Sequence, residues 1–124
     1  MRYVLAALAA WLPLSCGKAP PATAHGKPVG HWVKELQNPD ALKRKKAVEV
    51  LGNVGTADPQ ALPALIGAVK DPDPLVRTAA VQALLKIGPD AQDALPALSE
   101  AQKDPDPRVR SAAAKAVARV QGGK

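Results

Sequence analysis

The sequence predicts an all-α fold built from stacked pairs of antiparallel helices. The first observation is a period of 33 residues: the segment 71–77 (DPDPLVR) recurs as 104–110 (DPDPRVR), and a weaker copy starts at Asn38. The segment 61–65 (ALPAL) likewise returns at 94–98. The second observation is composition, because aromatic residues are only 2% and Phe is absent. A core of Ala, Val, Leu and Ile requires close helix contacts, and a fixed period of this length is typical of a repeat array.

The chain begins with features of a targeting segment, not of the repeats. Arg2 is followed by an uncharged, mostly apolar run to Leu14, which is shorter than the roughly 20 residues that span a bilayer. Residues 1–15 are therefore predicted to be a secretory signal peptide. Residues 16–30 are interrupted by Pro and Gly and predict a flexible tether.

The single cysteine of the chain, Cys16, lies where the apolar run ends, so no internal disulfide can form. The segment 12–17 (LPLSCG) resembles the lipobox of bacterial lipoproteins. That resemblance implies acylation of Cys16 and a protein exported to the bacterial periplasm or cell envelope, lipid-anchored to a membrane. The alternative is cleavage after Ala24, at the A-x-A sequence 22–24, which would release a soluble exported protein.

The helices are expected in a fixed order after the tether. A short helix over 31–37 carries Trp32 on its apolar side, where the ring would cover the N-terminal end of the stack. Three first helices then begin at equivalent aspartates, which can cap the free N–H groups of the first turn; these are Asp40, Asp73 and Asp106. Pro74 and Pro107 follow at the first helical position, where a missing N–H has no cost.

The helix ends and the buried stripe also repeat. Gly55 and Gly88 are expected to close the first two helices in a left-handed conformation. Second helices are expected over 60–70 and 91–103, with Pro63 and Pro96 in their first turns. The third repeat ends after its first helix, and 122–124 form a tail. The expected stripe of the first helices comprises Val76 and Val109, then Ala47, Ala80 and Ala113, then Leu51, Leu84 and Val117, then Val54, Ile87 and Val120.

These residues resemble a known repeat family. The segments 71–77 (DPDPLVR), 79–88 (AAVQALLKIG) and 95–98 (LPAL) are similar to HEAT-like repeats, in the short form found in phycobilisome-lyase-type proteins. The resemblance implies a short right-handed α-solenoid, an armadillo-type superhelix, over residues 31–121. Its repeats would be about 38–70, 71–103 and 104–121.

The resemblance also implies a role for repeated charges. Arginines recur at 33-residue spacing beside the capping aspartates, as the pairs Asp40 and Arg44, Asp73 and Arg77, and Asp106 and Arg110. In similar repeats the arginine reaches an aspartate of the neighbouring repeat, forming a ladder that fixes the register of stacking. The alternative is a row of arginines that binds a ligand.

The sequence offers no set of groups typical of catalysis. His25 and His31 are six residues apart, without a third His or a nearby Cys, so no metal or other cofactor is expected. The serines have no neighbouring His, and there is no glycine-rich phosphate loop. We therefore expect a non-catalytic protein–protein interaction or scaffold module. Its groove for an unidentified protein or peptide would lie along the second helices at Ala64, Gly67, Ala68 and Ala97.

Several alternatives stay open at this point. The family resemblance suggests an accessory subunit of a bilin lyase-type enzyme. The basic run 43–46 (KRKK) suggests binding to anionic lipid or nucleic acid, although no aromatic platform for stacking bases is present and nucleic acid is disfavoured. Because the third repeat lacks a second helix, an incompletely covered apolar side could pair two chains into a dimer. That side would comprise Val109, Ala113, Val117 and Val120.

Overall fold

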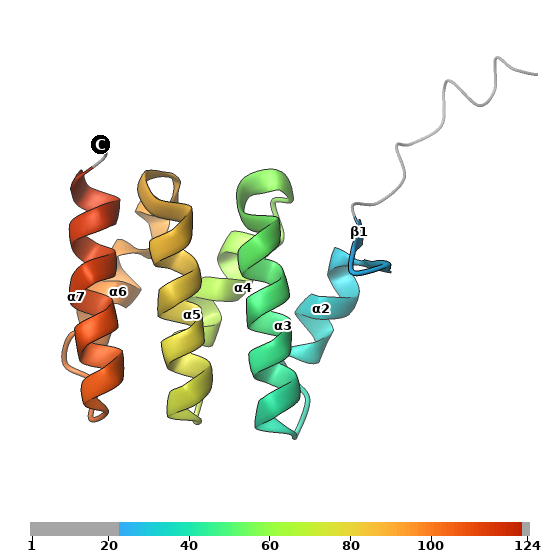
Figure 1. Ribbon diagram of the computed structural model, residues 1–124, viewed down its shortest axis with the longest axis horizontal. Helices are drawn as coiled ribbons and strands as arrows, with labels where there is room; N and C mark the ends of the chain where they lie inside the picture. The colour runs from blue at the N-terminus through green and yellow to red at the C-terminus, as the bar shows by residue number, and fades with distance from the viewer. Residues whose placement is uncertain (1–22, 123–124) are drawn as a thin grey trace, which may run out of the picture.

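The computed structural model describes residues 23–122 as two layers of helices that form an α-solenoid (Figure 1). The first helices α3 (Ala41–Val54), α5 (Pro74–Ile87) and α7 (Pro107–Gly122) lie side by side in one layer. The second helices α4 (Ala61–Ala68) and α6 (Leu95–Ala101) lie behind them, and α2 (Val29–Glu35) closes one end. Of the helices described, none is both long and apolar enough to cross a bilayer.

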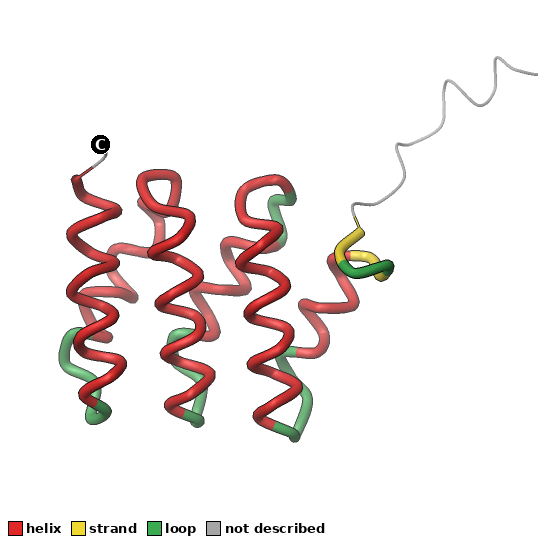
Figure 2. Tube along the Cα trace, viewed as in Figure 1, coloured by secondary structure: helices red, strands yellow, loops and turns green. Residues whose placement is uncertain are grey.

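The first helices begin where the capping chemistry predicts. The carboxylate of Asp40 accepts a hydrogen bond from the N–H of Leu42 at 2.9 Å. Asp73 and Asp106 cap α5 and α7 in the same way, at 2.7 and 2.8 Å. The loops that precede these helices all lie at the same end of the stack (Figure 2), so the first helices run parallel to one another.

The ends of α3 and α5 differ in one respect from the expected left-handed caps. Gly55 has φ 56° and ψ −129°, and Gly88 has φ 73° and ψ −135°. The predicted positive φ is confirmed, but ψ lies far from the left-handed helical value, in a region open to glycine alone. This conformation leads directly into the 3-10 helices η1 (Gly55–Ala57) and η2 (Gly88–Ala94).

The second helices are shorter than predicted, and their prolines explain why. A helix starting near residue 91 would place Pro96 beyond the first turn, where the absent N–H would remove an intrahelical bond. The chain instead makes the 3-10 segment η2 and begins α6 at Leu95, so that Pro96 lies in the first turn. Pro63 lies in the first turn of α4 for the same reason.

The C-terminal part of the predicted tether, residues 23–30, forms ordered structure and is not a flexible linker. Thr23–Ala24 (β1) and Lys27–Pro28 (β2) form a small antiparallel hairpin, and α2 begins at Val29. The indole N–H of Trp32 donates to the carbonyl of Ala24 at 2.8 Å, which fixes the hairpin to α2. The expected tether 16–30 thus contains ordered structure over residues 23–30, because the indole supplies a tertiary contact that composition does not show.

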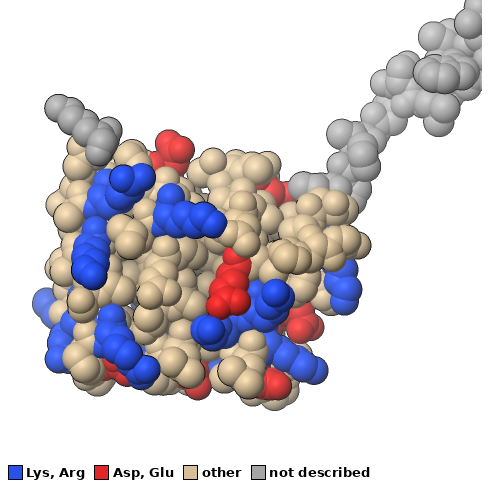
Figure 3. All heavy atoms as spheres, in the orientation of Figure 1, with Lys and Arg blue, Asp and Glu red and all other residues tan. Residues whose placement is uncertain are grey.

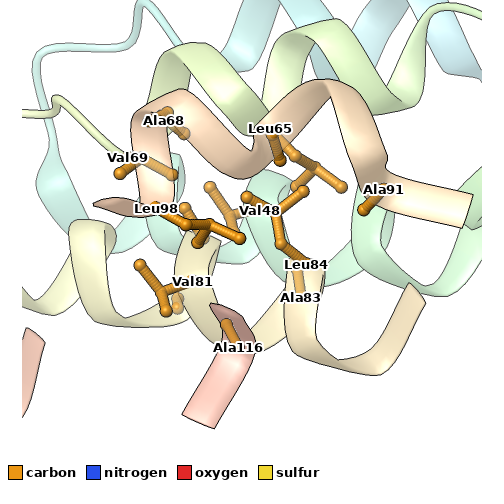
Figure 4. Close-up of a cluster of buried hydrophobic side chains, with 14 of the residues drawn as sticks. Val48, Leu65, Ala68, Val69, Val81, Ala83, Leu84, Ala91, Leu98 and Ala116 are labelled. Carbon is orange, nitrogen blue, oxygen red and sulfur yellow. The ribbon is translucent and has the colours of Figure 1, made fainter. Parts of the chain in front are cut away.

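Small aliphatic side chains form a single core between the two layers. Val48, Leu65, Leu84 and Leu98 come from four successive helices and point toward one another in Figure 4, and each is fully buried. Alanines fill the spaces between them. The helices α3 and α5 approach closely, because a Cβ added to Gly52 would lie 2.8 Å from Cβ of Ala83. The predicted stripe is buried, with Val54, Ile87 and Val117 only half-buried.

The last helix has no incompletely covered apolar stripe. Val109, Ala113 and Val120 are fully buried and Val117 is half-buried, because α5, η2 and α6 pack against that side of α7. The expectation that a dimer forms on these residues was therefore based on a surface that is not exposed. The outward side of α7 instead carries the exposed Ala114 and Ala118. The equivalents of Ala114 in earlier repeats are the fully buried Val48 and Val81.

Candidate functional site

A ladder of arginine–aspartate pairs crosses the boundaries between repeats. Arg44 on α3 donates through Nε to Oδ2 of Asp71 at 2.9 Å and through Nη2 to Oδ1 at 3.1 Å. Its Nη1 also donates to the carbonyls of Asn38 and Pro39, in its own loop. The hydrogen bond to Asp71 is the main cause that raises the pKa of Arg44 above its ordinary value.

Arg77 repeats this arrangement one unit later. Its Nη1 donates to the carbonyls of Asp71 and Pro72, at 2.9 and 3.0 Å. Its Nη2 donates to Oδ1 of Asp104 at 3.1 Å, and Nε lies 2.9 Å from Oδ2 in an ion pair. Both side chains are largely buried, with 16% and 9% of their surface exposed.

The ladder uses different aspartates from the predicted ones. The first aspartate of each DPDP loop, Asp71 or Asp104, accepts the hydrogen bonds of the arginine. The predicted residues Asp40, Asp73 and Asp106 serve instead as helix caps. Each capping carboxylate accepts an N–H of its own helix, whereas Asp71 and Asp104 accept the N–H of the cap residue and the arginine of the preceding repeat. The 33-residue period could not distinguish the two, because both aspartates of the loop recur.

The two ends of the ladder are unequal. Arg110 on α7 donates to the carbonyls of Asp104 and Pro105 at 2.8 and 3.0 Å, but no carboxylate among residues 23–122 pairs with it. At the other end, Asn38 stands where the later repeats have Asp71 and Asp104. Its Oδ1 accepts the N–H of Asp40 at 2.9 Å, as the aspartates do for the equivalent N–H groups.

Two hollows lie along the second helices, one at each repeat boundary. The first, of about 510 Å³, lies between α2 and α4 and is lined in part by Ala64, Gly67 and Ala68. The second, of about 490 Å³, lies between α4 and α6 and includes Ala97. Both are also lined by the segment Lys70, Asp71 and Pro72, so they adjoin across one loop. We call the two together the second-helix groove.

The predicted groove residues thus lie in the walls of this groove, but contribute unequally. Ala64 is half-buried and Gly67 is exposed, with open space where a Cβ would lie. Ala68 and Ala97 are buried, so their backbone and neighbours form the surface there. Sequence reasoning missed Val33 on α2 and Leu36 just beyond its end, which complete the first hollow. Their apolar spacing in a terminal helix was the available signal.

The basic run 43–46 does not form one positive surface. Arg44 is held in the ladder, and Lys45 pairs with Glu49 on the same helix at 3.1 Å. Lys43 and Lys46 are exposed. The ion pairs thus neutralise two of the four charges, and the run carries less binding potential than its sequence indicates.

The two histidines lie beside Trp32. His31 and His25 approach Trp32 edge-on, with ring centroids 5.1 and 6.2 Å away. Within the described range 23–122, no three His, Cys, Asp or Glu side chains gather in a way that could hold a metal ion. The predicted signal peptide 1–15 and Cys16 lie outside the described residues.

Comparison with known proteins agrees with this architecture. The profile of a family described as HEAT repeats matches residues 29–118. No curated protein matches the sequence. Among solved structures, the chain is similar to a crystal structure described as an engineered protein of the Northeast Structural Genomics Consortium, with a TM-score of 0.59 and 23% identity. The match covers 77% of this chain and 46% of the engineered one, so this chain spans about half of its length.

Proposed function

The chain belongs to the HEAT-repeat family, and from that membership we propose that it is a non-catalytic protein-interaction module that binds a peptide segment in the second-helix groove. HEAT repeats generally act as interaction scaffolds. The observation that carries the proposal is the pair of adjoining hollows of similar volume, about 510 and 490 Å³, at successive repeat boundaries.

The groove suits a chain that approaches closely. Gly67 has no side chain to hold the partner away, and Ala64 adds only a methyl group. The rim is rigid, because Arg44 and Asp71 join the repeats on either side of the first hollow. A rigid, preformed groove reduces the ordering cost of binding to that of the peptide alone.

The repeat geometry sets the spacing of the peptide's anchors. Packed helices are about 10 Å apart, and a peptide in the polyproline II conformation advances about 3.1 Å per residue with three residues per turn. Side chains about three residues apart could therefore enter the two hollows. The small walls favour aliphatic anchors over aromatic ones.

A peptide-display selection against the protein tests the proposal. We expect selected peptides to carry aliphatic residues about three positions apart and to lose binding to Gly67→Glu, which places a charge in the groove. Ala118→Glu, on the outward side of α7, is the matched control and should bind normally. Equal binding to both variants, or a selection that enriches no peptide, would refute a peptide-binding groove.

Export and lipid anchoring stay predictions, and the hairpin supports one of the two alternatives. Cleavage after Ala24 would remove β1 and the carbonyl that accepts the hydrogen bond from Trp32. Processing at Cys16 would leave both in place, so we favour the lipid-anchored form. Mass spectrometry of the mature N-terminus separates an acylated Cys16 from a chain that starts at His25.

The alternative of an accessory subunit of a bilin lyase-type enzyme also stays a prediction. A change in the absorbance of bilin when it is mixed with the protein would test it.

A further inference from the structure

The helices α5 and α7 contain six basic residues and no acidic residue. Two of the six are neutralised, because Arg77 pairs with Asp104 and Arg108 pairs with Asp106. Lys86, Arg110, Lys115 and Arg119 have no carboxylate partner among the ion pairs of residues 23–122. The layer of first helices thus carries a positive charge that its own helices do not balance.

At two rows of equivalent positions the side chains become more basic along the stack. Equivalent positions on α3, α5 and α7 hold Glu49, Gln82 and Lys115, changing from acidic to neutral to basic. A second row holds Asn53, Lys86 and Arg119. Figure 3 shows basic side chains spread over the face of the first helices, with few acidic ones among them.

Two of these cations lie against groups of the preceding repeat. The ammonium of Lys86 donates to Oδ1 of Asn53 on the neighbouring helix. The guanidinium of Arg119 lies against Gly88, where an added Cβ would be 3.2 Å from its Nε. Both cations therefore lie beside the carboxyl end of α5.

The same face is hollowed between α5 and α7. A depression of about 510 Å³ is lined by the half-buried Leu85 and Ala112 and by the exposed Lys115, among others. Its lining combines apolar side chains with uncharged polar ones and with two basic ones, Lys115 and the ion-paired Arg108. A flat membrane surface would not fill such a depression, and these two helices offer no aromatic side chain for stacking a nucleic-acid base.

We propose that the face of α5 and α7 docks an acidic, amphipathic segment of a protein partner, with an aliphatic side chain over Leu85 and Ala112 and carboxylates at Lys86, Lys115 and Arg119. The inference rests on the proposed interaction function but uses the opposite layer from the second-helix groove. The occupant follows from charge complementarity, which also speeds encounter.

Fluorescence anisotropy with one synthetic peptide tests the proposal. The probe is a labelled helical peptide with Glu along one side and Leu along the other, and its scrambled sequence is the composition control. We expect binding that weakens as salt is added. The double variant Lys86→Glu, Lys115→Glu should lose about tenfold or more in affinity, corresponding to about 1.4 kcal/mol. All substituted residues are exposed, and circular dichroism verifies folding.

The matched control is Lys70→Glu, Lys103→Glu, which makes the same change in charge on the other layer. We expect it to bind the peptide within about twofold of wild type, a difference of about 0.4 kcal/mol. Equal losses in both double variants would mean non-specific charge attraction and would overturn the inference. So would an absence of binding by the wild-type protein, or binding to anionic vesicles alone. A loss confined to Lys70→Glu, Lys103→Glu and to Gly67→Glu would place the peptide in the groove, which refutes this inference while supporting the proposed function.

Discussion

Arg44 and Asp71 form a two-point hydrogen-bonded pair across a repeat boundary, at 2.9 and 3.1 Å. The third nitrogen of the same guanidinium, Nη1, donates hydrogen bonds to two carbonyls of the loop before α3. One side chain therefore joins a loop, a helix and the next repeat. Because the guanidinium donates in fixed directions, it specifies where the next repeat sits as well as adding stability.

The ladder can be tested at Arg77, using Arg110 as its control. Both arginines donate hydrogen bonds to carbonyls of the loop before their own helix, but of the two only Arg77 also bonds a carboxylate in the next repeat. We expect Arg77→Ala to lower the free energy of unfolding by about 1–3 kcal/mol more than Arg110→Ala, since bonds between charged groups carry that energy. Urea unfolding followed by circular dichroism measures the difference. Equal losses would mean that the inter-repeat pair adds nothing.

A second variant separates the charge of Asp104 from its shape. Asn38 shows that an amide at this loop position still accepts the N–H two residues later. Asp104→Asn should therefore keep the loop and lose only the attraction to Arg77. The double variant Arg77→Ala, Asp104→Asn should then be less destabilised than the sum of the single variants. Strict additivity would contradict direct coupling of the two side chains.

Two helical glycines should respond to alanine in opposite directions. At Gly52 the new Cβ would lie 2.8 Å from that of Ala83, whereas at Gly67 nothing lies within 4 Å. Alanine favours a helix by about 1 kcal/mol over glycine, and overpacking costs about 1–3 kcal/mol. We expect Gly67→Ala to raise the melting temperature and Gly52→Ala to lower it. Adding Ala83→Gly to Gly52→Ala should restore part of the loss, and no restoration would refute the steric explanation.

The N-terminal hairpin should depend on one hydrogen bond. Trp32→Phe keeps an aromatic ring but removes the N–H that donates to Ala24 at 2.8 Å. We expect a loss of about 1 kcal/mol in the free energy of unfolding. Faster amide exchange at β1 and β2 than in the wild-type protein should accompany it. Unchanged exchange would mean that the hairpin is held by other contacts.

Stability should depend on pH through Asp106. The hydrogen bond from the side chain of Arg108, and that from its backbone N–H, lower the pKa of Asp106 to about 2. An unfolded Asp has a pKa of about 3.9, so the ionised form stabilises the fold fully above that value. This contribution disappears as the pH falls through about 2.

Asp106→Asn isolates this effect, because asparagine can still cap α7. We expect the variant to be less stable than wild type at pH 7, and the difference to shrink as the pH falls from about 4 toward 2. Urea midpoints at each pH measure it. A difference that is constant with pH would show that the carboxylate charge has no role.

The caps and the buried stripe were predictable from sequence because both depend on local chemistry. Asp73 followed by Pro74 fixes the start of α5 without reference to any other part of the chain. Which aspartate accepts the arginine of the ladder was not predictable, because Asp71 and Asp73 both recur at the same period. Only the folded structure shows that Asp71 faces Arg44 while Asp73 caps α5.

The hairpin was missed for a different reason. Its turn places His25 and Gly26 at φ 52° and 75°, as a tight hairpin turn requires. Asparagine is the usual residue at the first of these positions, and each strand has only two residues. The sequence signal was therefore weak, and the stabilising contact comes from Trp32, eight residues beyond Ala24.

Asn38 stands where the later repeats have Asp71 and Asp104, and this difference affects whether separate copies of the repeat unit can stack on one another. Identical units that stack head to tail can add further copies without limit, producing filaments. Here the leading edge of a second copy would offer a neutral amide to Arg110 and would have to displace α2, while the outward side of α7 carries the small exposed side chains of Ala114 and Ala118. Within residues 23–122, the ion pair that joins neighbouring repeats is therefore not available between two copies stacked head to tail, which disfavours filaments of this unit.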